Sequence, residues 1–166
     1  MQPNLLLELY EYNQYANRVV LETAGKLRLT DLYRESSPSH GSVFGLLAHM
    51  LAVETGYLAN CRGELFKFER PTTLEDLAQR WETLAEGQLA YLAELKESQL
   101  VEVVPARIGS QDFQFPRWQL MAQALIHSTH HRGELSIILT EIGQPLPVLD
   151  IIIPFAEESG QPWPWK

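Results

Sequence analysis

Residues 120–142, LMAQALIHSTHHRGELSIILTEI, contain the clearest helical pattern of the chain and its closest group of histidines. The apolar and histidine positions that recur every three or four residues are Leu120, Ala124, His127, His131, Leu135, Ile138 and Ile142. Pro116 is suited to the first turn of such a helix, and Gly143 and Pro145 are typical of its end. The segment therefore predicts a long amphipathic helix with two histidines in its inward stripe.

Three earlier segments have the same periodicity. They extend from Pro3 to Leu27, from an N-cap at Ser39 or Ser42 to Cys61–Gly63, and from the capping box of Thr72 and Glu75 to Leu95. The turn-forming run SSPSHG separates the first two. Four long helices with two longer connections predict an all-α four-helix bundle, and the length suits a single domain over residues 1–166.

Two parts of the chain lack this pattern. Between Leu100 and Phe115, the β-prone runs VEVV and DFQF flank Gly109, which predicts a short hairpin or extended crossover before the last long helix. After Gly143, five prolines surround LDIII and PWPW. Because proline interrupts helices, we expect an irregular Pro-rich C-terminal tail.

The composition excludes several classes of protein. Hydrophobic residues make up 45% and charged residues 20% of the 166 positions, which is typical of a folded globular domain. A net charge of −8 repels a phosphate backbone, so we expect no nucleic-acid partner. The N-terminus lacks the basic start of a secretory signal, and no apolar run reaches the roughly 20 residues that a bilayer requires. With Cys61 as its single cysteine, the chain is expected to be cytoplasmic, without a membrane partner.

The histidine spacing predicts a metal site. His127 and His131 lie one helical turn apart on one face, and His49 lies beside the apolar stripe of the second predicted helix. Three buried imidazoles without partners would be costly, and one shared ion would satisfy all of them. Three protein nitrogens also leave a position open, as catalytic metal sites do. A histidine-rich polar network without a metal is the alternative.

The other candidate ligands have simpler interpretations. His130 is rotated about 60° from His127 on the helical wheel, so we expect it to flank the site. His40 lies in the turn-rich linker and is expected to be solvated. Cys61 is three turns beyond His49, too far along the helix to share the ion, and is expected to pack in the core.

Three segments, YNQYANRVV, LLAHMLAVE and HSTHHRGELSIILTEIGQPLPVLD, resemble the DinB-like, or YfiT-like, superfamily of bacterial four-helix-bundle metalloproteins. The resemblance covers nearly the whole chain, and its specific part is the H-x-x-x-H-R-G-E run with the upstream histidine. It implies that His49, His127 and His131 hold one divalent ion, zinc or nickel, with positions open to water. Members of known activity transfer or use low-molecular-weight thiols, as S-transferases or a thiol-dependent isomerase.

The residues around the histidines have weaker interpretations. Glu134 is placed to accept a hydrogen bond from a ligand imidazole or to act as a catalytic base, with a solvated flank as the alternative. Arg132 is a candidate to pair with a carboxylate, and Gly133 to allow close helix packing. Asn13 and Asn17 are candidates for the pocket mouth, for interhelical hydrogen bonds or for simple solvation.

The sequence favours a metal-dependent enzyme, a thiol-dependent S-transferase of the DinB-like type, in which the ion activates a thiol or water. No cysteine is near the predicted site, so the sulfur would come from a small thiol co-substrate. The alternatives are a metal-dependent hydrolase and a non-catalytic, stress-related binding protein that the metal stabilises. A Ser-His-Asp hydrolase is disfavoured because G-x-S-x-G is absent. The expected partner is a small-molecule substrate, and the sequence leaves a homodimer as an open alternative.

Overall fold

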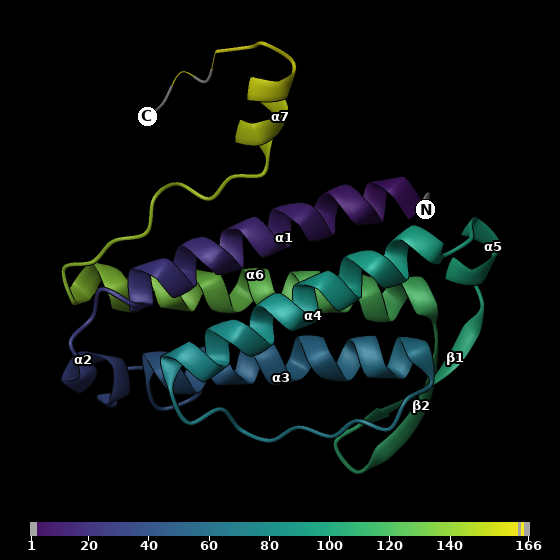
Figure 1. Cartoon of the computed structure of the whole chain (residues 1–166), viewed down its shortest axis with the longest axis horizontal. Helices are drawn as coiled ribbons and strands as arrows, with labels where there is room; N and C mark the ends of the chain where they lie inside the picture. The colour runs from purple at the N-terminus through teal and green to yellow at the C-terminus, as the bar shows by residue number, and fades with distance from the viewer. Residues whose placement is uncertain (1–2, 163, 165–166) are drawn as a thin grey trace.

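The computed structural model describes residues 3–162 and 164, and this part of the chain is mostly helical, as the sequence predicts (Figure 1). The long helices are α1 (Pro3–Ala24), α3 (Val43–Arg62), α4 (Leu74–Glu94) and α6 (Arg117–Glu141). The short elements are α2 (Leu29–Tyr33), α5 (Glu97–Leu100), β1 (Val103–Ile108), β2 (Gln111–Pro116) and α7 (Ile152–Glu158). None of the described helices is both long and apolar enough to cross a membrane.

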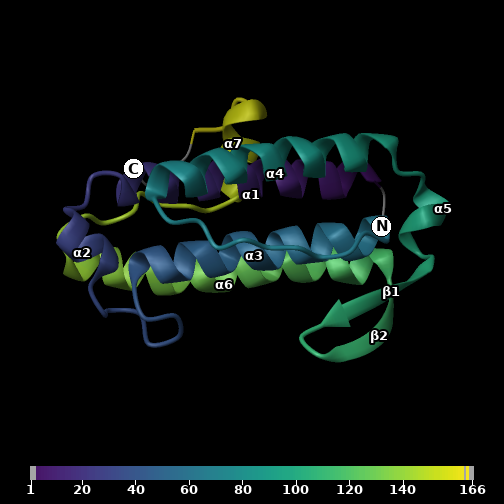
Figure 2. The same ribbon diagram turned by 60° about the horizontal axis from the view of Figure 1, so that its bottom comes forward.

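The four long helices lie alongside one another in two layers, α1 with α4 and α3 with α6 (Figure 2). Each of them also contacts a helix of the other layer, α1 with α6 and α3 with α4. Residues 63–73 run back along the length of α3, so α3 and α4 point in the same direction (Figure 1). The two longer connections are residues 25–42, which contain α2, and residues 95–116, which contain α5 and the hairpin.

The core consists of two apolar clusters at opposite ends of the helices. One includes Val20, Leu47, Leu77 and Leu135, and the other includes Leu6, Tyr10, Leu92, Leu100 and Met121. Between them, at the middle of all four helices, is a group that we call the polar layer: Asn13, Asn17, Glu54, Gln88, Ser128 and Arg132. All six are buried, so this layer interrupts an otherwise apolar interior.

The predicted hairpin is present. β1 pairs with β2 in an antiparallel register that opposes Val103 with Pro116 and Ile108 with Gln111. Gly109 in the turn has φ +62°, a left-handed conformation that favours glycine. The hairpin leads directly into α6 and so sets where that helix begins.

Two helix boundaries differ from the expected ones, and one alternative that the sequence left open is resolved. The first helix ends at Ala24 rather than near Leu27, and α2 follows within the linker. Of the two candidate caps, Ser42 is the N-cap of α3, because its hydroxyl accepts a hydrogen bond from the Gly45 N–H at 3.0 Å. The Thr72 cap is wrong: Thr73 caps α4 by accepting from the Asp76 N–H at 3.1 Å.

The C-terminal tail is irregular only in part. Residues 144–150 have no regular structure, but α7 follows and lies outside the four long helices (Figure 1). Pro154 does not prevent this helix because it occupies the first turn, where its missing N–H has no intrahelical partner. The Tyr12 hydroxyl on α1 donates a hydrogen bond to the Leu149 carbonyl and ties the tail to the body.

Candidate metal centre

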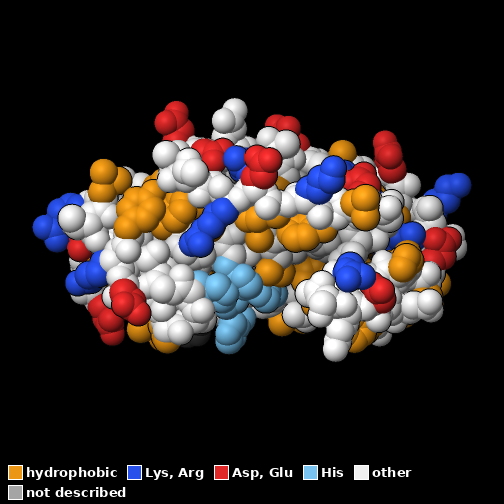
Figure 3. All heavy atoms as spheres, turned by 90° about the horizontal axis from the view of Figure 1, so that it is seen from below, with side chains coloured by type: hydrophobic (Ala, Val, Ile, Leu, Met, Phe, Trp, Pro, Cys, Tyr) orange, Lys and Arg blue, Asp and Glu red, His pale blue; other side chains and the backbone are white. Residues whose placement is uncertain are grey.

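The histidines of α3 and α6 meet at the middle of one face of the molecule, where Figure 3 shows their side chains gathered together. His49 projects from α3, and His127 and His131 project from successive turns of α6. The Nε2 atom of His127 lies 3.1 Å from Nε2 of His49 and 3.2 Å from Nε2 of His131. The structure therefore brings the three predicted ligands together through the same ring nitrogen.

These separations fit a shared ion. Two nitrogens that bind one zinc ion at 2.0–2.1 Å with tetrahedral angles are separated by about 3.3 Å. Neutral imidazole nitrogens are ligands that suit zinc, nickel and related divalent ions. Among the described residues, Nδ1 of His127 is buried without a hydrogen-bond partner, so the partners of this ring are all reached through Nε2. The donor set could thus hold a divalent metal ion.

Burial keeps two of these rings neutral. Partial burial, together with the neighbouring imidazoles of His40, His127 and His131, lowers the pKa of His49 from 6.5 to about 4. Burial likewise lowers the pKa of His127 to about 4, again with a contribution from the other histidines. At neutral pH both rings are unprotonated and have a nitrogen lone pair available for a metal.

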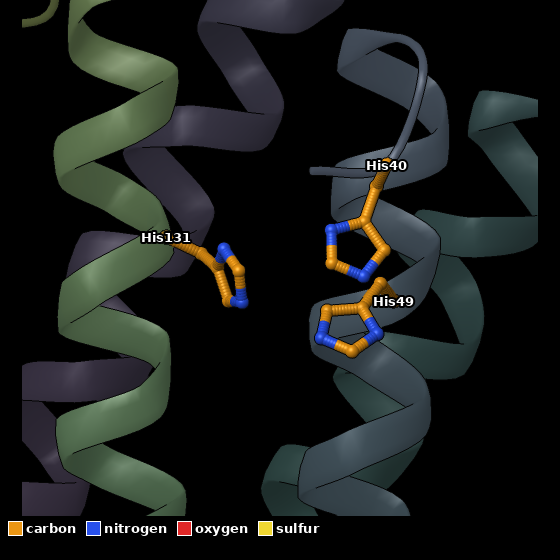
Figure 4. Close-up of side chains that lie close together, drawn as sticks. All are labelled: His40, His49 and His131. Atoms are coloured by element: carbon orange, nitrogen blue, oxygen red, sulfur yellow. The ribbon is translucent and has the colours of Figure 1, made fainter. Parts of the chain in front are cut away.

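His40 is not the solvated loop residue that the sequence suggests. Its ring is half-buried and stacks on His49 with centroids 3.6 Å apart and planes at 22°. The ligand nitrogens of His40, His49 and His131 all lie within 4.8 Å of one another (Figure 4). The correction has a physical cause: the loop closes on itself through hydrogen bonds between Ser36, Ser37 and Gly41, and the His40 carbonyl oxygen lies close to Gly45 in the first turn of α3, which brings the His40 ring against His49.

His130 is exposed and flanks the site, as its position on the helical wheel predicts. Its ring lies edge-on to His131 at a centroid distance of 5.0 Å. It lines a different cavity of about 690 Å³ between α1 and α6, whose walls are mainly apolar and include Leu6, Leu125 and Ile126. This histidine is therefore a natural control for the three converging ones.

Glu134 connects the histidines to the loop. Its Oε2 lies 3.4 Å from His131 Nδ1, and its carboxylate accepts hydrogen bonds from the hydroxyls of Ser37 at 2.6 Å and Ser39 at 2.7 Å. Partial burial raises the pKa of Glu134, but the hydrogen bonds from both serines and His131 outweigh it and lower the pKa below its usual value. Of the roles expected for Glu134, orienting a ligand imidazole is the one that these contacts fit.

Arg132 and the asparagines of α1 belong to the polar layer. The Arg132 guanidinium donates to the Oδ1 atoms of Asn13 at 2.6 Å and Asn17 at 2.7 Å. Both asparagines in turn donate to Glu54 on α3, at 3.1 and 2.9 Å. The structure thus shows that the asparagines form interhelical hydrogen bonds, one of the alternatives left open by the sequence. Arg132 does not pair directly with a carboxylate; Asn13 and Asn17 lie between its guanidinium and Glu54.

Glu54 was not apparent from the sequence as a site residue. It is 1% exposed and also accepts hydrogen bonds from Ser128 at 2.6 Å and Gln88 at 2.9 Å. Ser128 and Arg132 each directly follow a converging histidine, so these bonds fix the rotation of α6 about its axis. One signal was available: Glu54 is five residues after His49 and is the only acidic residue of α3.

Gly133 does not serve close helix packing. A Cβ atom built on it would meet no atom within 4 Å, and the residue is exposed. The glycine that does allow a close approach is Gly45, where a Cβ would lie 2.2 Å from the His40 carbonyl oxygen. Among the glycines of the described chain, Gly45 alone has a backbone atom within 3 Å of a built Cβ.

Comparisons with known proteins agree with this architecture. A DinB-like protein from Bacillus cereus is similar in structure, with a TM-score of 0.60, 18% identity, and coverage of 81% of this chain and 90% of that one. A DinB-like protein from Bacillus subtilis, YjoA, has a TM-score of 0.65 and 22% identity, and covers 86% of this chain and 97% of its own. No curated protein matches the sequence. The model of the DinB family matches residues 1–160, and the chain therefore belongs to the DinB family.

Proposed function

We propose that this chain is a four-helix bundle that binds one divalent ion, zinc or nickel, through His49, His127 and His131, and that it is a metal-dependent enzyme. One observation carries the proposal: the Nε2 atom of His127 lies 3.1 and 3.2 Å from the Nε2 atoms of the other two histidines. A bound ion would supply a Lewis acid that lowers the pKa of a small thiol or of water. Membership of the DinB family is consistent with this chemistry.

The protein's own residues prepare the site in three ways. Burial keeps His49 and His127 neutral, with lone pairs available at neutral pH. Glu134 lies within reach of the Nδ1 proton of His131 and so favours the tautomer that leaves Nε2 free. The hydrogen bonds of Ser128 and Arg132 in the polar layer hold α6 with its two histidines facing α3.

The proposed substrate is a small thiol that is joined to an electrophile, as in a thiol S-transferase. The only cysteine, Cys61, is near the far end of α3, and burial raises the pKa of its thiol to about 12. It is therefore poorly suited to act as a nucleophile at neutral pH. The sulfur would come from a low-molecular-weight thiol co-substrate, and hydrolysis of an activated ester or amide is the competing reaction.

A second candidate is a non-catalytic protein in which the ion only ties α3 to α6. One observation favours it: the ring of His40 stacks on His49 beside the converging nitrogens and restricts access to them. A panel of small thiols and electrophiles separates the two candidates. Turnover that depends on the metal supports the enzyme, and no turnover with any thiol, ester or amide substrate supports the non-catalytic protein.

Elemental analysis of protein purified without a metal-affinity step tests the metal site. We expect about one divalent ion per chain in the wild-type protein and in His130→Ala, and loss of the ion in His127→Ala, because His130 is exposed and lines a different cavity. Circular dichroism should show that both variants are folded. Equal metal content in the two variants would contradict the assignment of His127.

A cobalt-substituted sample tests for an open position. We expect a small thiol to change the visible spectrum of the cobalt protein, with an apparent affinity that rises with pH until the free thiol ionises. An unchanged spectrum at every pH, with cobalt still bound, would contradict thiol chemistry at this site and favour the non-catalytic candidate.

A further inference from the structure

The His40 side chain lies beside the three converging histidines, although it comes from a loop and not from a long helix. Its ring stacks on His49 at 3.6 Å and lies edge-on to His131 at 5.3 Å. Figure 4 shows it over His49 and on the side that faces His131. The ligand nitrogens of these three residues are within 4.8 Å of one another, so only a small shift of the loop would bring His40 to a shared ion.

The hydrogen bonds of Ser39 determine which nitrogen of His40 carries the proton. The Ser39 hydroxyl lies 2.7 Å from Oε2 of Glu134 and 2.7 Å from Nδ1 of His40. A carboxylate can only accept, so the one hydroxyl proton of Ser39 goes to Glu134. The contact with His40 then requires that Nδ1 donates its proton to the Ser39 oxygen. This tautomer leaves Nε2 of His40 with a free lone pair, the form that binds a metal.

Glu134 therefore orients two histidines, His131 at 3.4 Å and His40 through Ser39. Ligand histidines commonly have such an acceptor at their second nitrogen. The loop is fixed to the same carboxylate by Ser37, whose hydroxyl donates to Glu134 at 2.6 Å and accepts from the His40 N–H at 3.0 Å. A solvated histidine would have no need of this arrangement.

We propose that His40 is a fourth, displaceable protein ligand of the ion that the proposed function places on His49, His127 and His131. With His40 bound, the site holds four nitrogens and is closed; with the loop displaced, one position is open. His40 comes from the loop of residues 36–42 and not from one of the long helices, and its nitrogen lies within 4.8 Å of those of His49 and His131, which fits a ligand that reaches the ion and leaves readily. A substrate that binds the ion would compete with His40, so the loop controls access to the site.

Zinc affinity, measured by competition with a chromophoric chelator, tests this proposal on the full-length protein. The variants are His40→Phe, which keeps a ring stacked on His49 but has no ligand nitrogen, and His40→Ala; His130→Phe is the control. We expect both His40 variants to bind zinc at least about 10-fold more weakly than the control. Ser39→Ala should also bind zinc about 10-fold more weakly, because it removes the hydroxyl that connects Glu134 to Nδ1 of His40. The cobalt spectra of the His40 variants should differ from that of the wild type, and added imidazole should restore the spectrum of His40→Ala.

The outcomes separate this inference from the proposed function. If His127→Ala loses zinc but His40→Phe retains the affinity and cobalt spectrum of the wild type, His40 only stacks on the site, and the fourth-ligand proposal is overturned while the metal site stands. If the wild-type protein binds neither zinc nor cobalt, both proposals are overturned. Circular dichroism of each variant identifies unfolding, and Ser39→Ala provides the same test with His40 intact.

Discussion

At the scale of single residues, the most unusual feature is a carboxylate in the middle of the core. Glu54 is almost fully buried, and four neutral side chains donate to it. The Arg132 guanidinium is also buried, and burial lowers its pKa, with the Glu54 charge acting in the opposite direction. Buried charges are tolerated only where such partners compensate them, so the polar layer is an energetic unit rather than a set of independent bonds.

Replacing Glu54 should therefore strongly destabilise the folded protein. We expect Glu54→Leu to lower the free energy of unfolding by about 3–5 kcal/mol, because four buried donors lose their acceptor and Arg132 loses its counter-charge. Glu82→Leu, at an exposed position of α4, is the control and should change stability by about 0.5 kcal/mol or less. Urea unfolding followed by circular dichroism measures both; similar values for the two variants would contradict the role of the polar layer.

The single thiol should be unreactive in the folded protein. Burial raises the pKa of Cys61 from 9.0 to about 12, partly offset by Arg117, so at pH 8 the folded state has roughly a thousandfold less thiolate than an unperturbed thiol. We expect alkylation by iodoacetamide at pH 8 to be slow without denaturant and fast in urea. The rate in the folded protein should increase only as the pH rises well beyond 9. Rapid modification of the folded protein at pH 8 would contradict this prediction.

At the scale of elements, the position of the loop depends on the first turn of α3. Ser42 caps that helix, and Gly45 lets the His40 carbonyl approach within a distance that no side chain permits. The same turn therefore begins the helix that carries His49 and places the ring that stacks on it. Local capping and the geometry of the candidate site are coupled here.

Two glycines should respond to alanine in opposite ways. Gly45→Ala would place its Cβ 2.2 Å from the His40 oxygen, so we expect a loss of about 1–3 kcal/mol in unfolding free energy and weaker zinc binding as the loop shifts. Gly133→Ala meets open space within α6, and we expect a gain of up to about 1 kcal/mol from helix propensity alone. Thermal and urea unfolding of both variants provide the measurement, and destabilisation by Gly133→Ala would contradict the open environment.

At the scale of the whole molecule, the candidate site joins two helices that are distant in sequence. α3 and α6 also share the polar layer through Glu54 and Ser128, so an ion bound at the candidate site would stabilise the same pair of helices as the layer does. A ligand that binds only the folded state raises its stability in proportion to the logarithm of its concentration over its dissociation constant.

Zinc should accordingly stabilise the protein against heat. At a free zinc concentration of 100 times the dissociation constant, we expect about 2.7 kcal/mol of stabilisation and an increase in Tm of roughly 5–10 °C for a chain of this size. His127→Ala should show no zinc-dependent shift, and chelation of the metal should return the wild-type protein to its metal-free Tm. Differential scanning calorimetry at several zinc concentrations provides the test; equal shifts in both proteins would place the ion elsewhere.

The sequence by itself determined the helical class, the main helices and the one-turn spacing of His127 and His131. These follow from local periodicity, capping and turn chemistry, which are properties of neighbouring residues. The errors are local: Thr73 caps α4 in place of the adjacent Thr72, and the short helix α7 forms within a tail that the prolines predict to be irregular.

Only the tertiary structure decided which polar residues meet. His40 is three residues before the first residue of α3, and its stacking on His49 depends on the conformation of the loop, which no periodicity encodes. The six residues of the polar layer come from all four long helices and join only when the helices pack at one register. Contacts between segments distant in sequence are set by packing and by the need to satisfy buried charges, and these forces act only in the assembled fold.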